Sequence, residues 1–179
     1  PTLASMLYIR ILGASEIRFG GVRVGAEQPL TFALLLMLTV SGSAGLQRRE
    51  LAATLWPDVP DRDRNHRLRS LLHRLRHLGA PLACVGATVS LHSAAIDFRE
   101  FITVPGSIDL VRTRLASIGA ILPGLAASSP ALADRLDDVR DLAVGTLTRW
   151  LTAAMRLARA AGDWALVEQL ARAGQEVDP

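Results

Sequence analysis

The spacing of hydrophobic and polar positions predicts strands first and helices afterwards along the first hundred residues. Short strands are predicted at residues 7–12, 17–19 and 22–24, the last two joined by Gly20-Gly21. Helices are predicted at 30–40, 47–56 and 62–78, and a second hairpin pairs 82–85 with 88–92. This order of elements is typical of a winged helix-turn-helix, an α+β DNA-binding domain that we place at residues 6–104.

The remaining residues, 105–179, show helical periodicity throughout. Helices are predicted at 108–120, 130–161 and 164–174, with a turn at Gly162-Asp163. Two antiparallel helices closed by such a turn resemble one helical-hairpin repeat, so we expect an all-α, TPR-like domain here. One helix pair buries its own apolar face poorly, which is consistent with the front part of a longer protein.

The helix predicted at 62–78 has an apolar side and a basic side. Five leucines fall within one arc: Leu68, Leu71, Leu72, Leu75 and Leu78. The opposite side carries His66, Ser70, His73 and His77, with Arg69 and Arg76 along one margin and Arg67 and Arg74 along the other. A helix in the major groove needs this cross-section, because its centre meets base edges and its margins meet phosphates.

The distribution of charge agrees with a polyanionic partner. The chain of 179 residues carries a formal net charge of +3, and all 20 of its cationic side chains are Arg. Residues 1–104 hold 12 Arg and 8 acids, whereas residues 105–179 hold 8 Arg and 9 acids. The positive excess therefore lies in the first block, and it is concentrated on the helix at 62–78.

Three further residues are candidate DNA contacts. Arg48 and Arg49 stand at the start of the helix at 47–56, where cations oppose the helix macrodipole and a bound phosphate would offset that cost. Thr88 lies near the tip of the second hairpin, where it could touch the DNA backbone or minor groove. The hairpin itself contains no Arg, so we expect its contribution to be weak.

Two other interpretations compete with DNA contact. An arginine-rich helix can simply be a solvated face. His73 and His77 are also one turn apart, as the ligands of a metal ion would be. No Asp, Glu or Cys of this helix joins the pair on the same side, so we expect no metal.

Composition excludes several classes of protein. The longest apolar run, 30–40, is too short for a transmembrane helix, and no charged segment precedes an apolar one as in a secretory signal. The single cysteine, Cys84, rules out an intramolecular disulfide and is expected to be a small buried hydrophobic residue. The chain contains no phosphate-binding glycine loop and no nucleophile elbow. We therefore expect a cytoplasmic protein that is not an enzyme, binds no cofactor and does not enter a membrane.

The motifs resemble those of one known family. Leu55-Trp56-Pro57-Asp58 followed by the segment from Leu68 to Arg76 resembles the OmpR-type winged helix of SARP-type bacterial transcriptional activators. The second block resembles the bacterial transcriptional activator domain that follows it in that family. The matching stretches there are Leu122-Pro123-Gly124-Leu125, Val139-Arg140-Asp141-Leu142, and Gly162-Asp163-Trp164-Ala165 through Asp178-Pro179.

This resemblance implies an activator that binds double-stranded promoter DNA through the helix at 62–78. It also implies RNA polymerase as a partner and assembly as a homo-oligomer on direct repeats. The alternative is a protein-interaction adaptor whose degenerate winged helix no longer binds DNA.

Overall fold

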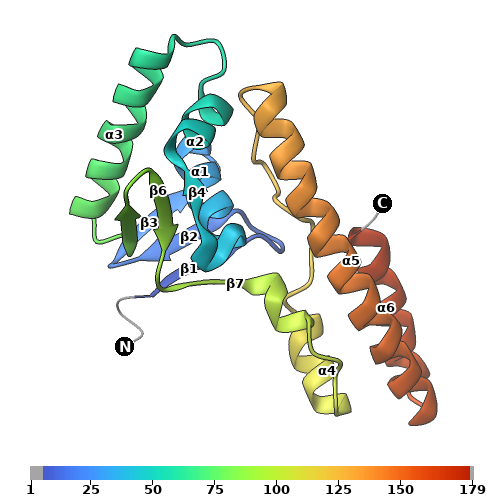
Figure 1. The fold of residues 1–179 in the computed structure, drawn as a ribbon. Helices are drawn as coiled ribbons and strands as arrows, with labels where there is room; N and C mark the ends of the chain where they lie inside the picture. The colour runs from blue at the N-terminus through green and yellow to red at the C-terminus, as the bar shows by residue number, and fades with distance from the viewer. Residues whose placement is uncertain (1–5, 178–179) are drawn as a thin grey trace. The chain divides into compact units, whose positions relative to one another are not determined.

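A computed structural model describes residues 6–177, which form two compact units (Figure 1). The first unit contains residues 6–9, 16–96 and 124–139, and the second contains 10–15, 97–123 and 140–177. The first unit mixes strands and helices and the second is largely helical. The domains expected at 6–104 and 105–179 stay a prediction, and the Asp178-Pro179 match lies outside the described residues.

A four-stranded sheet in the order β3-β2-β1-β7 belongs largely to the first unit. Its strands are β1 (Leu7–Arg10), β2 (Glu16–Phe19), β3 (Val22–Gly25) and β7 (Ala94–Ile96). The predicted hairpin of β2 and β3 is present, and both turn glycines, Gly20 and Gly21, have positive φ. The sequence did not predict β7, because two of its three residues are alanines; it pairs in parallel with β1, whose edge groups it satisfies.

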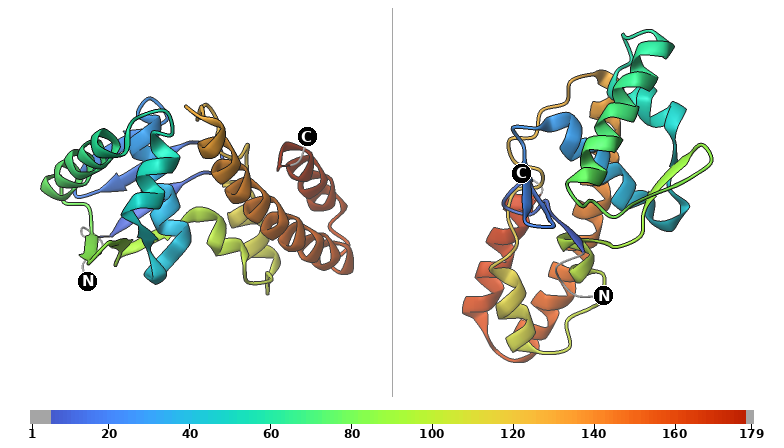
Figure 2. Two further views of the ribbon diagram at one scale, coloured as in Figure 1. Left: turned by 45° about the horizontal axis from the view of Figure 1, so that its top comes forward. Right: turned by 90° about the vertical axis from the view of Figure 1, so that its left-hand side faces the viewer.

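The three helices expected in the first block are present, followed by the expected hairpin. They are α1 (Pro29–Ser41), α2 (Arg48–Leu55) and α3 (Asp61–His77), and the hairpin strands are β5 (Leu82–Val85) and β6 (Thr88–Leu91). Helix α1 is buried from Thr31 to Thr39, so it forms the centre of the core of this unit. The right-hand view of Figure 2 shows the β5–β6 hairpin projecting beside α3.

The start of α2 is fixed to this hairpin. A two-residue strand that the sequence did not predict, β4 (Leu46–Gln47), pairs with β6, and the Arg48 N–H donates to the carbonyl oxygen of Ala87 at 2.9 Å. Gly45 has φ 65°, and a Cβ there would lie 2.4 Å from the carbonyl oxygen of Val89. Because only glycine permits this approach, the chain can bring α2 against the hairpin.

The second unit is built from helices α4 (Ile108–Leu115), α5 (Pro130–Ala160) and α6 (Trp164–Val177), with the first ten residues of α5 belonging to the first unit. The prediction that the first of these helices continues to residue 120 is wrong. The chain leaves the helix after Leu115 because Ile121 forms a bridge with Leu12, and a Cβ at Gly119 would lie 3.0 Å from the Cα of Gly13. This long-range pairing overrides the helical periodicity.

Helices α5 and α6 form the expected helical hairpin (Figure 1). Gly162 closes α5 with φ 71°, and its N–H donates to the carbonyl oxygen of Arg159. Asp163 then caps α6, because its Oδ1 accepts from the Leu166 N–H at 3.1 Å. Within residues 6–177, no helix has the length and apolar character needed to cross a membrane.

A buried carboxylate holds segment 10–15 to segment 97–123. Asp97 Oδ2 accepts from the N–H groups of Ile11 and Leu12, both at 3.0 Å, and its Oδ1 accepts from the Phe98 N–H at 2.8 Å. Burial raises the pKa of the Asp97 carboxyl above its ordinary value, although the three N–H donors oppose that shift. Asp97 therefore caps the turn that begins at Phe98 and also joins this turn to the distant residues Ile11 and Leu12.

Acidification should weaken the attachment of α6 through Asp163. Its hydrogen bond from Arg112, 2.7 Å long, lowers the pKa of the Asp163 carboxyl, so the folded-state pKa lies below the unfolded one. The stabilisation is therefore complete above the ordinary pKa of aspartate and is lost as the pH falls through the lowered value. We expect Asp163→Ala to reduce the free energy of unfolding in urea at pH 6 and to have little effect at pH 2. An equal loss of unfolding free energy at both pH values would show that the ionised Asp163 carboxylate is not the source of the stabilisation.

Candidate nucleic-acid interface

Helix α3 has charges at both ends that favour its formation. Asp61 and Asp63 lie in its first turn, and Arg74, Arg76 and His77 lie in its last turn, as the helix macrodipole prefers. The helix ends in a Schellman motif, in which the N–H of Ala80 donates to the Leu75 carbonyl oxygen and that of Gly79 to the Arg76 carbonyl oxygen. Gly79 occupies the required left-handed position, with φ 87°.

One side of α3 is buried in the first unit. Its four core leucines are Leu68, Leu71, Leu72 and Leu75, each exposing 7% of its surface or less. The fifth leucine of the predicted arc does not join them, because α3 ends at His77 and Leu78, the residue after it, remains 42% exposed. The apolar side is therefore shorter by one residue than the sequence predicted.

The opposite side of α3 faces solvent. All eight residues that the sequence assigned to DNA contact on this helix are exposed: His66, Arg67, Arg69, Ser70, His73, Arg74, Arg76 and His77. Arg69 and Arg76 border a hollow between α3, the start of α2 and strand β5. Arg67 and Arg74 border a second hollow, on the side of α1 and Trp56. The two arginine margins thus lie on opposite flanks of the helix.

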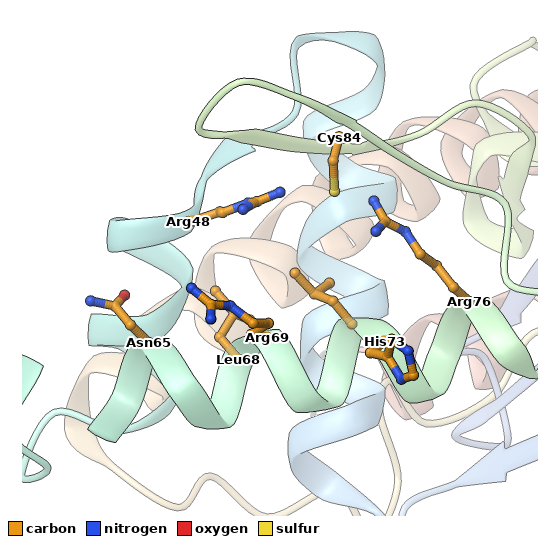
Figure 3. A pocket seen from close by; sticks show the side chains of 8 residues that line it. Arg48, Asn65, Leu68, Arg69, His73, Arg76 and Cys84 are labelled. Carbon is orange, nitrogen blue, oxygen red and sulfur yellow. The ribbon is translucent and has the colours of Figure 1, made fainter. Parts of the chain in front are cut away.

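The hollow beside β5, of about 480 Å³, is lined by side chains from three elements (Figure 3). Arg48 reaches it from α2, Arg69 and Arg76 from α3, and Cys84 from β5. Figure 3 shows the guanidinium groups of Arg48 and Arg76 directed into the space below Cys84. Cys84 is half-buried at this hollow, so the expectation that it is a buried hydrophobic residue is wrong.

Arg48 differs from the other cations at this hollow because it is half-buried. Its Nε is fully buried, and no acceptor for it is found among the described residues. A buried donor without a partner costs about 1–3 kcal/mol, so Arg48 is a costly residue at this position in the fold. The end of its guanidinium group points into the hollow, where an anionic oxygen can reach it (Figure 3).

The two remaining predicted contacts differ in accessibility. Arg49 is exposed in the first turn of α2. Thr88 is half-buried, and its hydroxyl oxygen accepts a hydrogen bond from Gln47 Nε2 at 3.0 Å. Thr88 therefore helps to hold the hairpin against β4, while Val85 at the other side of the hairpin turn is 79% exposed.

The arginine margins of α3 lack carboxylate partners within residues 6–177. Arg67, Arg69, Arg74 and Arg76 form no ion pair there, whereas Arg64 pairs with Asp61 at the start of the helix. Helix α2 is held on its far side by an ion pair between Glu50 and Arg135, 2.5 Å long. The positive charge of these four arginines is thus left uncompensated, as a surface for a polyanion requires.

Sequence reasoning missed Asn65, which lines the same hollow as Arg48 and can both donate and accept hydrogen bonds. Its position one turn before Arg69 was the available signal. The described part of the chain contains no group of three or more His, Cys, Asp or Glu side chains placed to hold a metal ion. His73 and His77 do approach each other, with their Nε2 atoms 3.2 Å apart.

Comparison with models of known protein families finds no match for this chain, and comparison with curated proteins finds none either. Among solved structures, the chain is similar to EmbR of Mycobacterium tuberculosis, which was solved in complex with a low-affinity phosphopeptide. The TM-score is 0.55 at 21% sequence identity, and the match covers 90% of this chain and 48% of that one. The chain thus spans about half the length of that protein, and the likeness shows a shared fold: a mixed α/β region followed by helices.

Proposed function

We propose that this chain is a DNA-binding transcriptional regulator whose first unit is a winged helix-turn-helix domain. Helices α2 and α3 would form the helix-turn-helix, and the β5–β6 hairpin would be the wing. The observation that carries the proposal is the exposed face of α3, where four arginines without carboxylate partners flank a row of His and Ser side chains. Base edges would meet the row and phosphates would meet the margins.

The geometry gives each group a role on the duplex. Arg69 and Arg76 on one flank and Arg67 and Arg74 on the other would contact the two strands that border the major groove. Arg48 would direct the end of its guanidinium group at a phosphate oxygen, with Arg49 beside it. Thr88 would contribute little, because Gln47 already uses its hydroxyl oxygen.

The resemblance to SARP-type activators and the fold shared with EmbR support a regulator of that type. We propose that it activates transcription in the cytoplasm by engaging RNA polymerase, and that it binds direct repeats as a homo-oligomer. The helical second unit would link DNA binding to the contact with RNA polymerase and to the assembly of the homo-oligomer. On this proposal the protein is not an enzyme and needs no cofactor.

Salt dependence tests the proposal directly. If about four to six phosphates are neutralised, a plot of log K against log salt should have a slope of roughly −4 to −5. The measurement is fluorescence anisotropy of labelled duplexes from upstream of the encoding gene and its neighbours, each measured with unrelated DNA as competitor. A slope close to zero for every duplex would refute DNA binding.

The second candidate is a protein-interaction adaptor that uses the same surface. It is favoured by the arginines around the Arg48 hollow, because a phosphorylated side chain of a protein partner could also satisfy them. Saturable binding of phosphorylated peptides, combined with a flat salt dependence on all duplexes, would favour the adaptor over the regulator.

A further inference from the structure

Two imidazole rings meet on the exposed face of α3. His73 and His77 are one turn apart, their ring centroids are 4.4 Å apart, and their Nε2 atoms are 3.2 Å apart. Both side chains are exposed, so an ion from solution can reach the space between them. The sequence led us to expect no metal at this pair, but the observed distance points the other way: we propose that His73 and His77 form a chelating site for a late first-row divalent cation of the class of Ni²⁺, Cu²⁺ and Zn²⁺.

The separation of the two nitrogens matches the bite of such an ion. Two imidazole nitrogens bound at about 2.1 Å to one ion lie about 3.0 Å apart at a right angle and about 3.4 Å apart at the tetrahedral angle. The observed 3.2 Å falls between these values, so the distance between the two nitrogens need not change when the ion binds. The helix has already brought the two ligands together, which removes most of the entropic cost of forming a chelate.

The hydrogen bond between the rings holds the two Nε2 atoms facing each other. One Nε2 donates its proton to the lone pair of the other. A cation can take the place of that proton when the donor ring shifts its hydrogen to Nδ1, a tautomer that neutral imidazole readily adopts. Rotation of each exposed side chain then turns its Nε2 lone pair toward the ion, and neither ring changes its net charge.

The surroundings of the pair determine which ions can bind. No third His, Cys, Asp or Glu of the described residues completes the site, so water would fill the other coordination positions. Arg69, Arg74 and Arg76 flank the pair and repel cations. Ions held by carboxylate oxygens, such as Mg²⁺ and Ca²⁺, therefore gain nothing here, whereas ions that bond strongly to imidazole nitrogen can offset the repulsion.

Nickel binding to the whole chain, with no added histidine tag, tests the proposal. Isothermal titration with NiCl₂ at pH 7.5 should give one site per chain, and Mg²⁺ should give none. Losing one arm of a chelate should weaken Ni²⁺ binding by roughly tenfold or more, so His73→Ala and His77→Ala should each show that loss. The matched control is His66→Ala, on the same face but two turns from His73, which should bind Ni²⁺ as the wild type does.

Circular dichroism of each variant will show that α3 is intact, since both histidines are exposed and lie outside the core. The proposal is overturned if His73→Ala and His77→Ala retain wild-type affinity, or if His66→Ala loses as much affinity as they do. The assay contains no DNA, so its result does not depend on the proposed regulatory function.

Discussion

Replacing Arg69 and Arg74 together by alanine should lower the affinity of the chain for its DNA site by roughly 30-fold. This figure assumes that each lost phosphate contact contributes about 1 kcal/mol to the binding free energy. The two side chains lie on opposite flanks of α3 and border different hollows, so each would serve a different strand of the duplex. Removing two phosphate contacts should also reduce the magnitude of the salt slope by about 2. Fluorescence anisotropy over a range of salt concentrations measures both quantities.

The matched control is Arg156→Ala with Arg159→Ala on α5. Both residues are exposed there, and the formal charge falls by the same amount. This control should change affinity far less, because long-range charge effects are screened at physiological salt. Equal losses for the two double variants would mean that net charge, and not the face of α3, governs DNA binding. Circular dichroism should show an unchanged helical content for both.

Replacing Asp97 by alanine should lower the free energy of unfolding by about 3 kcal/mol or more, because three N–H donors lose their acceptor. Those donors belong to Ile11, Leu12 and Phe98, and the carboxylate that they bind is 7% exposed. Urea unfolding followed by circular dichroism gives the value. Asp141→Ala, which removes an exposed carboxylate from α5, is the control and should change stability little.

The stability lost in Asp97→Ala should depend on pH, and the pKa of Asp97 gives the direction of that dependence. Because burial raises the pKa of the Asp97 carboxyl, the folded chain retains this proton to a higher pH than the unfolded chain does. The contribution of Asp97 to the free energy of unfolding therefore increases as the pH falls through the folded-state pKa. The gap between the wild type and Asp97→Ala should widen on acidification from pH 7, and a gap that narrows would mean that the N–H donors outweigh burial.

The sequence predicted α3 well because a helix places its residues at a fixed angular interval. The leucines at 68, 71, 72 and 75 are buried and the predicted contact residues are exposed, as the periodicity requires. The exception, Leu78, follows the end of the helix, where this angular relation no longer holds. The glycine turns that join β2 to β3 and end α3 were also predictable, since each needs a positive φ.

Elements that form only by pairing with distant residues could not be predicted from the local sequence pattern. Strands β4 and β7 form because β6 and β1 offer unpaired backbone groups, and neither is strand-like in its own sequence. The residues after Leu115 are likewise not helical because of a long-range pairing. Ile121 forms a bridge with Leu12, more than a hundred residues away in the chain. Such pairings depend on which edges meet in three dimensions.

By itself, the sequence determined the order of the three helices and two hairpins in the first block, the two-sided character of α3 and the absence of Lys, because composition and helical periodicity are local properties. The tertiary structure decided that Arg48 joins Arg69 and Arg76 around one hollow, that Asp97 binds the N–H groups of Ile11 and Leu12, and that two histidine nitrogens lie 3.2 Å apart. Distances between side chains depend on packing and on rotamers, which a one-dimensional pattern does not contain.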